Sequence, residues 1–181
     1  MANRIRIPDE EYAQRLGKAA EMAAKKGLDV LIVNSNDSDY ANVRYFSGFW
    51  PLFETAGVAI APSGKAALMV GPESTKFAAD RSALPDIFQL LEYRESADPA
   101  YPELKSANYA DVLSFLGVKG KKLRIGIGGW LLTNPVQLEG LKSCFPQATV
   151  ERADDIMVSL RSVKSEAELA CMREGFRITE I

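Results

Sequence analysis

The chain has 181 residues, of which 47% are hydrophobic, 25% charged and 9% aromatic, a composition typical of a globular protein with one large or two small domains. This composition excludes a collagen-like chain and argues against intrinsic disorder. The chain carries 22 Lys and Arg against 24 Asp and Glu. A net charge of −2 provides no overall field to attract nucleic acid or an anionic membrane, so we expect neither as a partner.

The chain contains no histidine. Imidazole is the usual general base near neutral pH and the commonest transition-metal ligand, so Ser–His and Cys–His nucleophile pairs are excluded within this chain. Cys144 and Cys171 are far apart and form neither a zinc knuckle nor a disulfide framework, which suits a reducing compartment. No apolar run approaches 18 residues, and the basic N-terminus lacks the apolar stretch of a signal peptide. We therefore expect a soluble, cytoplasmic protein.

The apolar pattern predicts helices that alternate with short strands. A helix starts at Pro8 and Asp9 and ends at Gly27, and a buried strand follows over 28–33. Two apolar runs, 56–61 and 66–70, flank a Pro-Ser-Gly-Lys turn and predict an antiparallel hairpin. The remaining expected elements are a helix over 73–81, a strand over 87–93, a loop over 95–108, a helix over 109–116, a strand running into the glycines at 126–129, a helix from Pro135, a strand over 148–151 and a helix through 156–160.

This alternation predicts an α/β fold with three layers, in which a mixed sheet of five or six strands has helices on both faces. The hairpin is what makes the sheet mixed. A last helix begins at a capping box formed by Ser165 and Glu168, and its apolar stripe is Leu169, Met172 and Phe176. No stop signal follows before Ile181. Either a natural C-terminal helix ends there, or the helix continues into a further domain.

Two motifs stand out, one around Ser165 and Glu168 and one around Tyr45 and Gly48. Both resemble sequences of the creatinase, prolidase and aminopeptidase P family of pita-bread metalloenzymes. The first resembles the connector to the catalytic domain of that family, with glycine at 175 in place of the usual alanine. It consists of Arg161, Lys164, Ser165, Glu168, Met172 and Arg173. The second resembles the stretch after the first strand of the family's N-terminal domain and consists of Asn42, Tyr45, Ser47, Gly48 and Phe49. Together the motifs and the order of strands extend the resemblance over essentially the whole chain.

The resemblance implies a creatinase/prolidase-like N-terminal domain at 1–160 and a connector helix at 161–181 that leads to an absent C-terminal catalytic domain. In the family, two aspartates, a histidine and two glutamates of that absent domain hold two divalent ions (Mn, Zn or Co), unless the protein is metal-free like creatinase. No catalytic residue and no metal ligand is therefore carried over to this chain. The implied partners are the chain's own catalytic domain, a second copy in a homodimer and a small peptide or amino-acid-like substrate.

The implied function is that of a non-catalytic domain of a metal-dependent Xaa-Pro peptidase or creatinase-like C–N hydrolase, which shapes substrate access and mediates dimerisation. Alone, the chain is expected to be catalytically silent, whereas its full-length parent is expected to be an enzyme. Two alternatives stay open. The chain is a stand-alone α/β binding or assembly module, or it belongs to a family member with lyase-type chemistry, because the absent domain sets the bond that is broken.

The loop over 49–54 concentrates aromatic side chains between a glycine and a strand. Phe49, Trp50 and Phe53 offer rigid contact area and as a group favour a pocket wall, although any one of them by itself could cover an edge of the sheet. The family places this loop near substrate. On that basis Glu54 is expected to repel a substrate carboxylate and to favour a cationic or amine-bearing group, which puts creatine in doubt.

Three residues before that loop have separate interpretations. Arg44 could bind a carboxylate through two hydrogen bonds, and we include it with the substrate-proximal residues, although a solvated or ion-paired arginine is the simpler interpretation. Tyr45 is expected to pack in the core. Gly48 is expected to permit a turn with positive φ.

Two further patterns are set aside as chemical sites. The glycines at 126–129 follow a strand, but Leu131 stands where a dinucleotide-binding fingerprint needs its third glycine. We therefore reject nucleotide binding. Asp154 and Asp155 precede a helix and are expected to cap it. Glu166, Glu168 and Arg173 are expected on a solvated helix face.

Overall fold

The computed structural model describes residues 5–180 and contains a six-stranded mixed sheet in the order β4-β3-β2-β1-β5-β6. The strands are β1 (Val30–Ser35), β2 (Ala56–Ile60), β3 (Ala66–Val70), β4 (Ile87–Gln89), β5 (Arg124–Gly128) and β6 (Thr149–Arg152). Strand β2 is antiparallel to β1 and β3, and the other neighbours are parallel, which confirms the predicted hairpin and mixed sheet. Residues 1–4 of the basic N-terminal segment and residue 181, where the last predicted helix meets the end of the sequence, lie outside the described residues.

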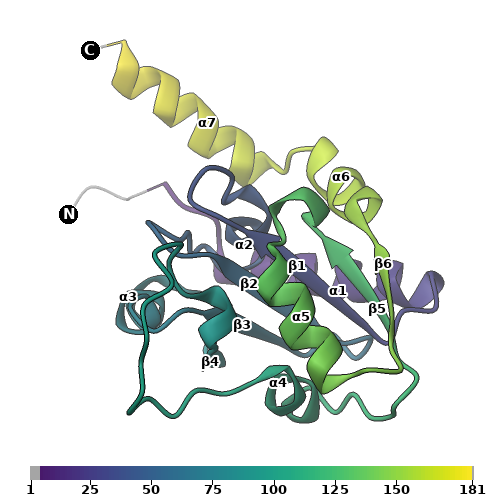
Figure 1. The fold of residues 1–181 in the computed structure, drawn as a ribbon. Helices are drawn as coiled ribbons and strands as arrows, with labels where there is room; N and C mark the ends of the chain where they lie inside the picture. The colour runs from purple at the N-terminus through teal and green to yellow at the C-terminus, as the bar shows by residue number, and fades with distance from the viewer. Residues whose placement is uncertain (1–4, 181) are drawn as a thin grey trace.

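Helices cover both faces of the sheet, as predicted (Figure 1). One face carries α1 (Asp9–Lys25), α2 (Ala41–Ser47), α3 (Thr75–Arg81) and α6 (Asp154–Ser162), whereas α4 (Tyr109–Phe115) and α5 (Pro135–Cys144) cover the other. Two short 3-10 helices, η1 (Leu91–Tyr93) and η2 (Trp130–Leu132), follow β4 and β5. The last helix, α7 (Glu166–Thr179), projects from the layered body (Figure 1).

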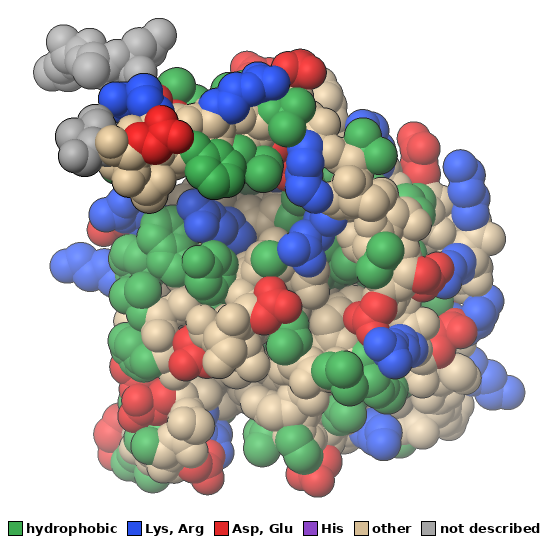
Figure 2. Space-filling model, turned by 90° about the horizontal axis from the view of Figure 1, so that it is seen from above, with side chains coloured by type: hydrophobic (Ala, Val, Ile, Leu, Met, Phe, Trp, Pro, Cys, Tyr) green, Lys and Arg blue, Asp and Glu red, His purple; other side chains and the backbone are tan. Residues whose placement is uncertain are grey.

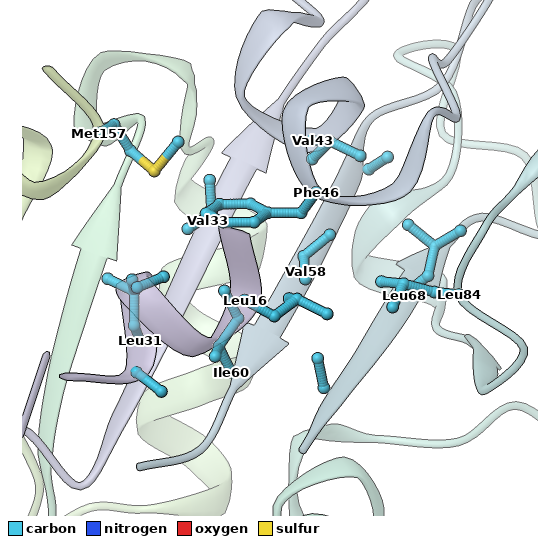
Figure 3. Packing of buried hydrophobic residues seen from close by; sticks show 14 of the residues in the cluster. Leu16, Leu31, Val33, Val43, Phe46, Val58, Ile60, Leu68, Leu84 and Met157 are labelled. Atoms are coloured by element: carbon cyan, nitrogen blue, oxygen red, sulfur yellow. The ribbon is translucent and has the colours of Figure 1, made fainter. Parts of the chain in front are cut away.

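The central strand β1 supplies both halves of the core. Successive side chains of a strand point to opposite faces, so Leu31 and Val33 join the cluster under α1, α2 and α6, while Val30 and Ile32 join the cluster under α4 and α5. Both faces are covered, which explains why residues 30–33 of β1 are an uninterrupted apolar run. Figure 3 shows the first cluster, in which side chains from α1, α2 and α6 meet those of the sheet.

Helix α2 was not predicted: no helix or strand was expected between the strand over 28–33 and the apolar run at 56–61. This helix is only seven residues long and does not show a full apolar period. Tertiary contacts stabilise it: Val43 and Phe46 are fully buried, and the backbone N–H of Val43 donates to the Ser35 hydroxyl at 3.1 Å. The strand predicted over 87–93 also ends early, because the chain turns into η1 after Gln89.

A chain of buried hydrogen bonds connects η1 and α4 to the central strand. The Tyr109 hydroxyl lies 3.2 Å from that of Tyr93, which donates to Oδ1 of Asn34 at 3.0 Å. Nδ2 of Asn34 in turn donates to the Thr133 hydroxyl at 2.9 Å. Burial raises the pKa of both tyrosines, so they stay protonated and able to donate. Gly57 is required beside them, because an added Cβ would lie 2.5 Å from the Tyr93 hydroxyl.

The central position of β1 leads to a stability prediction. Replacement of the fully buried Leu31 by alanine should lower the free energy of unfolding by about 3 kcal/mol, because it removes buried methyl groups and leaves a cavity. The matched change Leu131→Ala, at a side chain that is 83% exposed, should cost less than about 0.5 kcal/mol. Urea unfolding at equilibrium measures both, and equal losses would contradict the assignment of β1 to the core.

Candidate functional site

A groove of about 820 Å³ lies at the end of the molecule from which α7 projects. Its walls come from the segment before α1, the first turns of α1, helix α2, the end of α3 and the junction of α6 with α7. Figure 2 looks onto this end of the molecule and shows basic side chains next to apolar ones beneath α7. Elements far apart in the sequence therefore build one surface.

The groove is positively charged, although the whole chain is not. Six of the residues that line it are basic and three are acidic. The basic residues are Arg6, Arg15, Arg44, Arg81, Arg161 and Lys164, and the acidic ones are Asp9, Asp80 and Glu168. A concave surface lined mainly by one sign of charge concentrates ligands of the opposite sign. The groove therefore favours an anionic group.

Arg44 and Trp50 form an aromatic and cationic pair on the groove wall. The Arg44 guanidinium lies 4.9 Å from the ring centre of Trp50 and 5.8 Å from that of Tyr40. Among the ion pairs of residues 5–180, none involves Arg44. Stacking on an aromatic ring orients the guanidinium and leaves its N–H groups free for a carboxylate.

The loop over 49–54 divides into residues that face the groove and residues that do not. Trp50 is half-buried, lines the groove and packs edge-on against Phe77, with 6.0 Å between ring centres. Phe49 is fully buried and packs against the same Phe77 ring, with 5.7 Å between the ring centres. The expectation that Phe49 contacts substrate is therefore wrong, because its ring fills the core beneath the groove. Phe53 is 50% exposed and does not line the groove.

Glu54 points inward and is 1% exposed, which corrects its expected role in substrate selection. Its two carboxylate oxygens accept the backbone N–H groups of Glu73, at 3.1 Å, and Ser74, at 3.0 Å, just before α3. Gly71 makes room for the carboxylate, because an added Cβ would lie 2.2 Å from Oε1. Glu54 thus holds the start of α3 and is not placed to repel a substrate carboxylate.

Gly48 ends α2 with φ of 70°, which confirms the expected turn. An added Cβ would also lie 2.9 Å from the hydroxyl of Tyr12, so this position requires glycine for two reasons. Tyr45, on the last turn of α2, is half-buried and lines the groove. Its hydroxyl donates to the backbone carbonyl of Leu160 at 3.1 Å, so it connects α2 to α6.

The two sequence motifs meet at the groove, although 119 residues separate Asn42 from Arg161. Nη1 of Arg161 donates to Oδ1 of Asn42 at 2.6 Å. Glu168 is not fully solvated as expected, because its carboxylate lies 3.4 Å from Nη2 of Arg15. Arg15 was not among the predicted site residues. The sequence contained one signal for it. Arg15 lies three positions after Tyr12, within the apolar stripe of the predicted helix, and Glu11 lies one turn before it, a spacing that indicates a buried ion pair.

The patterns that were set aside have structural explanations. An added Cβ at Gly126 would lie 2.4 Å from Leu28, so this glycine permits close packing. Asp154 does not cap its own helix as expected. Its Oδ1 instead accepts the backbone N–H groups of Gly129, at 2.6 Å, and Trp130, at 3.0 Å, and holds the turn after β5. The capping box of Ser165 and Glu168 is confirmed.

Within residues 5–180, no three Cys, Asp or Glu side chains lie close enough together to hold a metal ion. The Cys, Asp and Glu side chains of this part of the chain therefore do not fit a two-metal centre of the kind that the resemblance implies for the catalytic domain. The same residues include no helix that is long and apolar enough to cross a membrane.

Comparison with known proteins agrees with the two motifs. The family model described as the creatinase/prolidase N-terminal domain matches residues 15–163. The chain belongs to this family. A curated protein of Sinorhizobium fredii, described as an uncharacterized hydrolase/peptidase, is 25% identical to this creatinase/prolidase N-terminal domain over 180 residues, or 97% of the chain. The chain spans only 44% of the length of that relative.

Solved structures share the fold of this creatinase/prolidase N-terminal domain. Dipeptidase PepE from Mycobacterium ulcerans superposes with a TM-score of 0.63 at 20% identity, covering 91% of this chain and 40% of that one. The N-terminal domain of the cytoplasmic peptidase PepQ from Mycobacterium tuberculosis has a TM-score of 0.56 at 21% identity, and the match covers 82% of this chain and 98% of that one. The prolidase from Pyrococcus horikoshii has a TM-score of 0.58 at 21% identity, and the match covers 87% of this chain and 37% of that one.

Glu54 leads to a prediction on the pH dependence of stability. Burial, together with the nearby Glu73 carboxyl, raises the pKa of Glu54 from its usual 4.5 to about 7. Between these values the folded state binds a proton that the unfolded state has lost, so the contribution of Glu54 to the free energy of unfolding falls as pH rises through this window. At about 1.4 kcal/mol per pKa unit, the fall amounts to at most about 3 kcal/mol.

The variant Glu54→Gln cannot titrate and should lack this fall. We expect wild type to lose free energy of unfolding relative to Glu54→Gln when urea unfolding at pH 7.5 is compared with pH 4.5. Parallel pH profiles for the two proteins would show that the carboxyl is not held in the way described.

Proposed function

We propose that this chain is the non-catalytic N-terminal domain of a metal-dependent hydrolase that acts on Xaa-Pro peptides or on a creatinase-like C–N bond, and that its groove shapes substrate access. Family membership and a curated relative described as a hydrolase/peptidase support the hydrolase assignment. The observation that carries the role in access is the placement of Arg44 against Trp50 on the wall of a positively charged groove.

This pair has the chemistry to receive a small peptide or amino-acid-like substrate. The Trp50 ring offers a rigid apolar surface that is fixed from behind by Phe77. The guanidinium of Arg44 can bind a carboxylate through two parallel hydrogen bonds. With Glu54 buried, no carboxylate of the 49–54 loop opposes such a group. The proposed substrate therefore carries a carboxylate next to a compact apolar part.

The proposed partner of the domain is a catalytic domain of the parent protein. In that domain two divalent ions (Mn, Zn or Co) would activate water and polarise the scissile bond, unless the parent is metal-free like creatinase. Helix α7 supports this partner, because none of its described residues is buried. Met172 is 48% exposed and Phe176 is 66% exposed. An apolar stripe of this kind suits a further packed layer. We also propose a cytoplasmic location, as the name of the PepQ structure states for that protein.

The role in substrate access is tested in the full-length parent. Trp50→Ala should lower kcat/KM for Xaa-Pro dipeptides by about fivefold or more, because the variant removes a wall of the groove, which corresponds to roughly 1 kcal/mol of lost binding. Phe53→Ala is the matched control, since Phe53 belongs to the same loop but does not line the groove. The 181-residue chain alone should give no product with added metal. A kcat/KM within twofold of wild type for Trp50→Ala would contradict the proposal.

Dimerisation is proposed as the second role of the domain. Sedimentation equilibrium at micromolar concentration should give a mass above the 19.8 kDa of one chain. The same measurement on the full-length parent serves as the reference, because the catalytic domain can add contacts. A parent that stays monomeric over this concentration range would remove dimerisation from the proposed function.

A further inference from the structure

Helix α7 is attached to the rest of the domain by polar contacts. No residue of the helix is fully buried, and the side chains of Met172 and Phe176 are exposed, so apolar packing contributes little to its direction. Its first residues instead contact α1. The Ser165 hydroxyl donates to Oε1 of Glu11 at 2.7 Å, and Oε1 of Glu168 lies 3.4 Å from Nη2 of Arg15. These contacts join the start of α7 to a helix more than 150 residues earlier in the chain.

Arg15 is the centre of this group of contacts and is 5% exposed. Its Nε and Nη2 atoms donate to Oε1 of Glu11 at 3.1 and 2.5 Å. Its Nη1 atom donates to the backbone carbonyl of Tyr45 at 2.8 Å, and its guanidinium lies 4.2 Å from the Tyr45 ring centre. One buried cation therefore bonds α1, α2 and α7 together.

The link from the body to α7 does not fix the direction of this helix by itself. Val163, directly after α6, is extended with φ of −101° and ψ of 119°, and its side chain is 81% exposed. On the near side of this link, Tyr45 holds the end of α6 through the carbonyl of Leu160. On the far side, the contacts of Glu11 and Arg15 hold the first turn of α7.

We propose that Arg15 is a positioning residue that sets the direction of α7 relative to the sheet domain. Its positive charge lies between two carboxylates, of which Glu11 is 17% and Glu168 is 21% exposed. Without Arg15 these carboxylates would face each other partly desolvated, and their repulsion would drive the start of α7 away from α1. Arg161, Lys164 and Cys171 line the groove from this junction, so the direction of α7 also sets the shape of the groove.

This role of Arg15 lies within the 181 residues and needs no catalytic domain. Only one consequence rests on the proposed function: in a parent with a catalytic domain after α7, Arg15 would set the position of that domain relative to the groove. The test is therefore made on the 181-residue chain, and its result is independent of any measured activity.

The experiment measures the distance between spin labels on α7 and on the body. The labels are attached at Arg173→Cys on α7 and Lys142→Cys on α5, two exposed positions, in a background in which Cys144 and Cys171 are replaced by serine. With Arg15 present we expect one narrow distance distribution. Arg15→Met should at least double its width, and Arg15→Lys, which keeps the charge but loses the directed bonds, should give an intermediate width.

Arg124→Met is the matched control. It also removes an ion-paired arginine that bonds across elements, to Glu151 and to the carbonyl of Lys26, but this arginine does not line the groove. Its distribution should stay as narrow as that of wild type. A narrow distribution in folded Arg15→Met overturns the proposal, and so does equal broadening in Arg124→Met.

If circular dichroism shows that Arg15→Met does not fold, a second variant provides the test. In the wild-type chain the Ser165 N–H donates to Oε2 of Glu168 at 2.9 Å. Glu168→Gln removes the charge that faces Arg15 but keeps an amide oxygen that can accept this N–H, so the capping box survives. Broadening in Glu168→Gln supports the proposal, and an unchanged narrow distribution overturns it.

Discussion

The ion pair and hydrogen bonds of the buried Arg15 guanidinium are the interaction on which the arrangement around the groove depends. A cation that is 5% exposed is costly unless its N–H groups have partners, and Arg15 has them on three helices. Glu11 comes from α1, the Tyr45 carbonyl from α2 and Glu168 from α7. The same requirement that stabilises the charge therefore fixes three separate elements relative to one another.

This constraint gives the family's sequence motifs a physical meaning. Residues of the motif around Tyr45 and of the motif around Glu168 meet at one point of the structure, because Arg15 contacts both the Tyr45 carbonyl and the Glu168 carboxylate. Arg161 bonds Asn42, and Tyr45 bonds the carbonyl of Leu160, so these contacts hold α2 to α6. Glu168 pairs with Arg15 and so connects α7 to α1.

The residues of the loop over 49–54 have different structural roles. Phe49 fills the core, Glu54 holds the start of α3, and Trp50 between them reaches the groove. The buried neighbours on each side anchor the backbone, so the Trp50 ring is held in place at little entropic cost. Arg44 from α2 then stacks on this ring, and the two residues together form an aromatic and cationic surface that neither would provide alone.

The sequence by itself determined the α/β class, the mixed sheet, the hairpin and the capping box of α7, because these follow from local periodicity and from turn and capping residues. The motifs also identified the family. Only the tertiary structure decided that Phe49 and Glu54 face inward, that α2 is a helix, and that Arg15 pairs with Glu168. Burial and long-range ion pairs depend on which segments meet in space, and a local pattern does not contain that information.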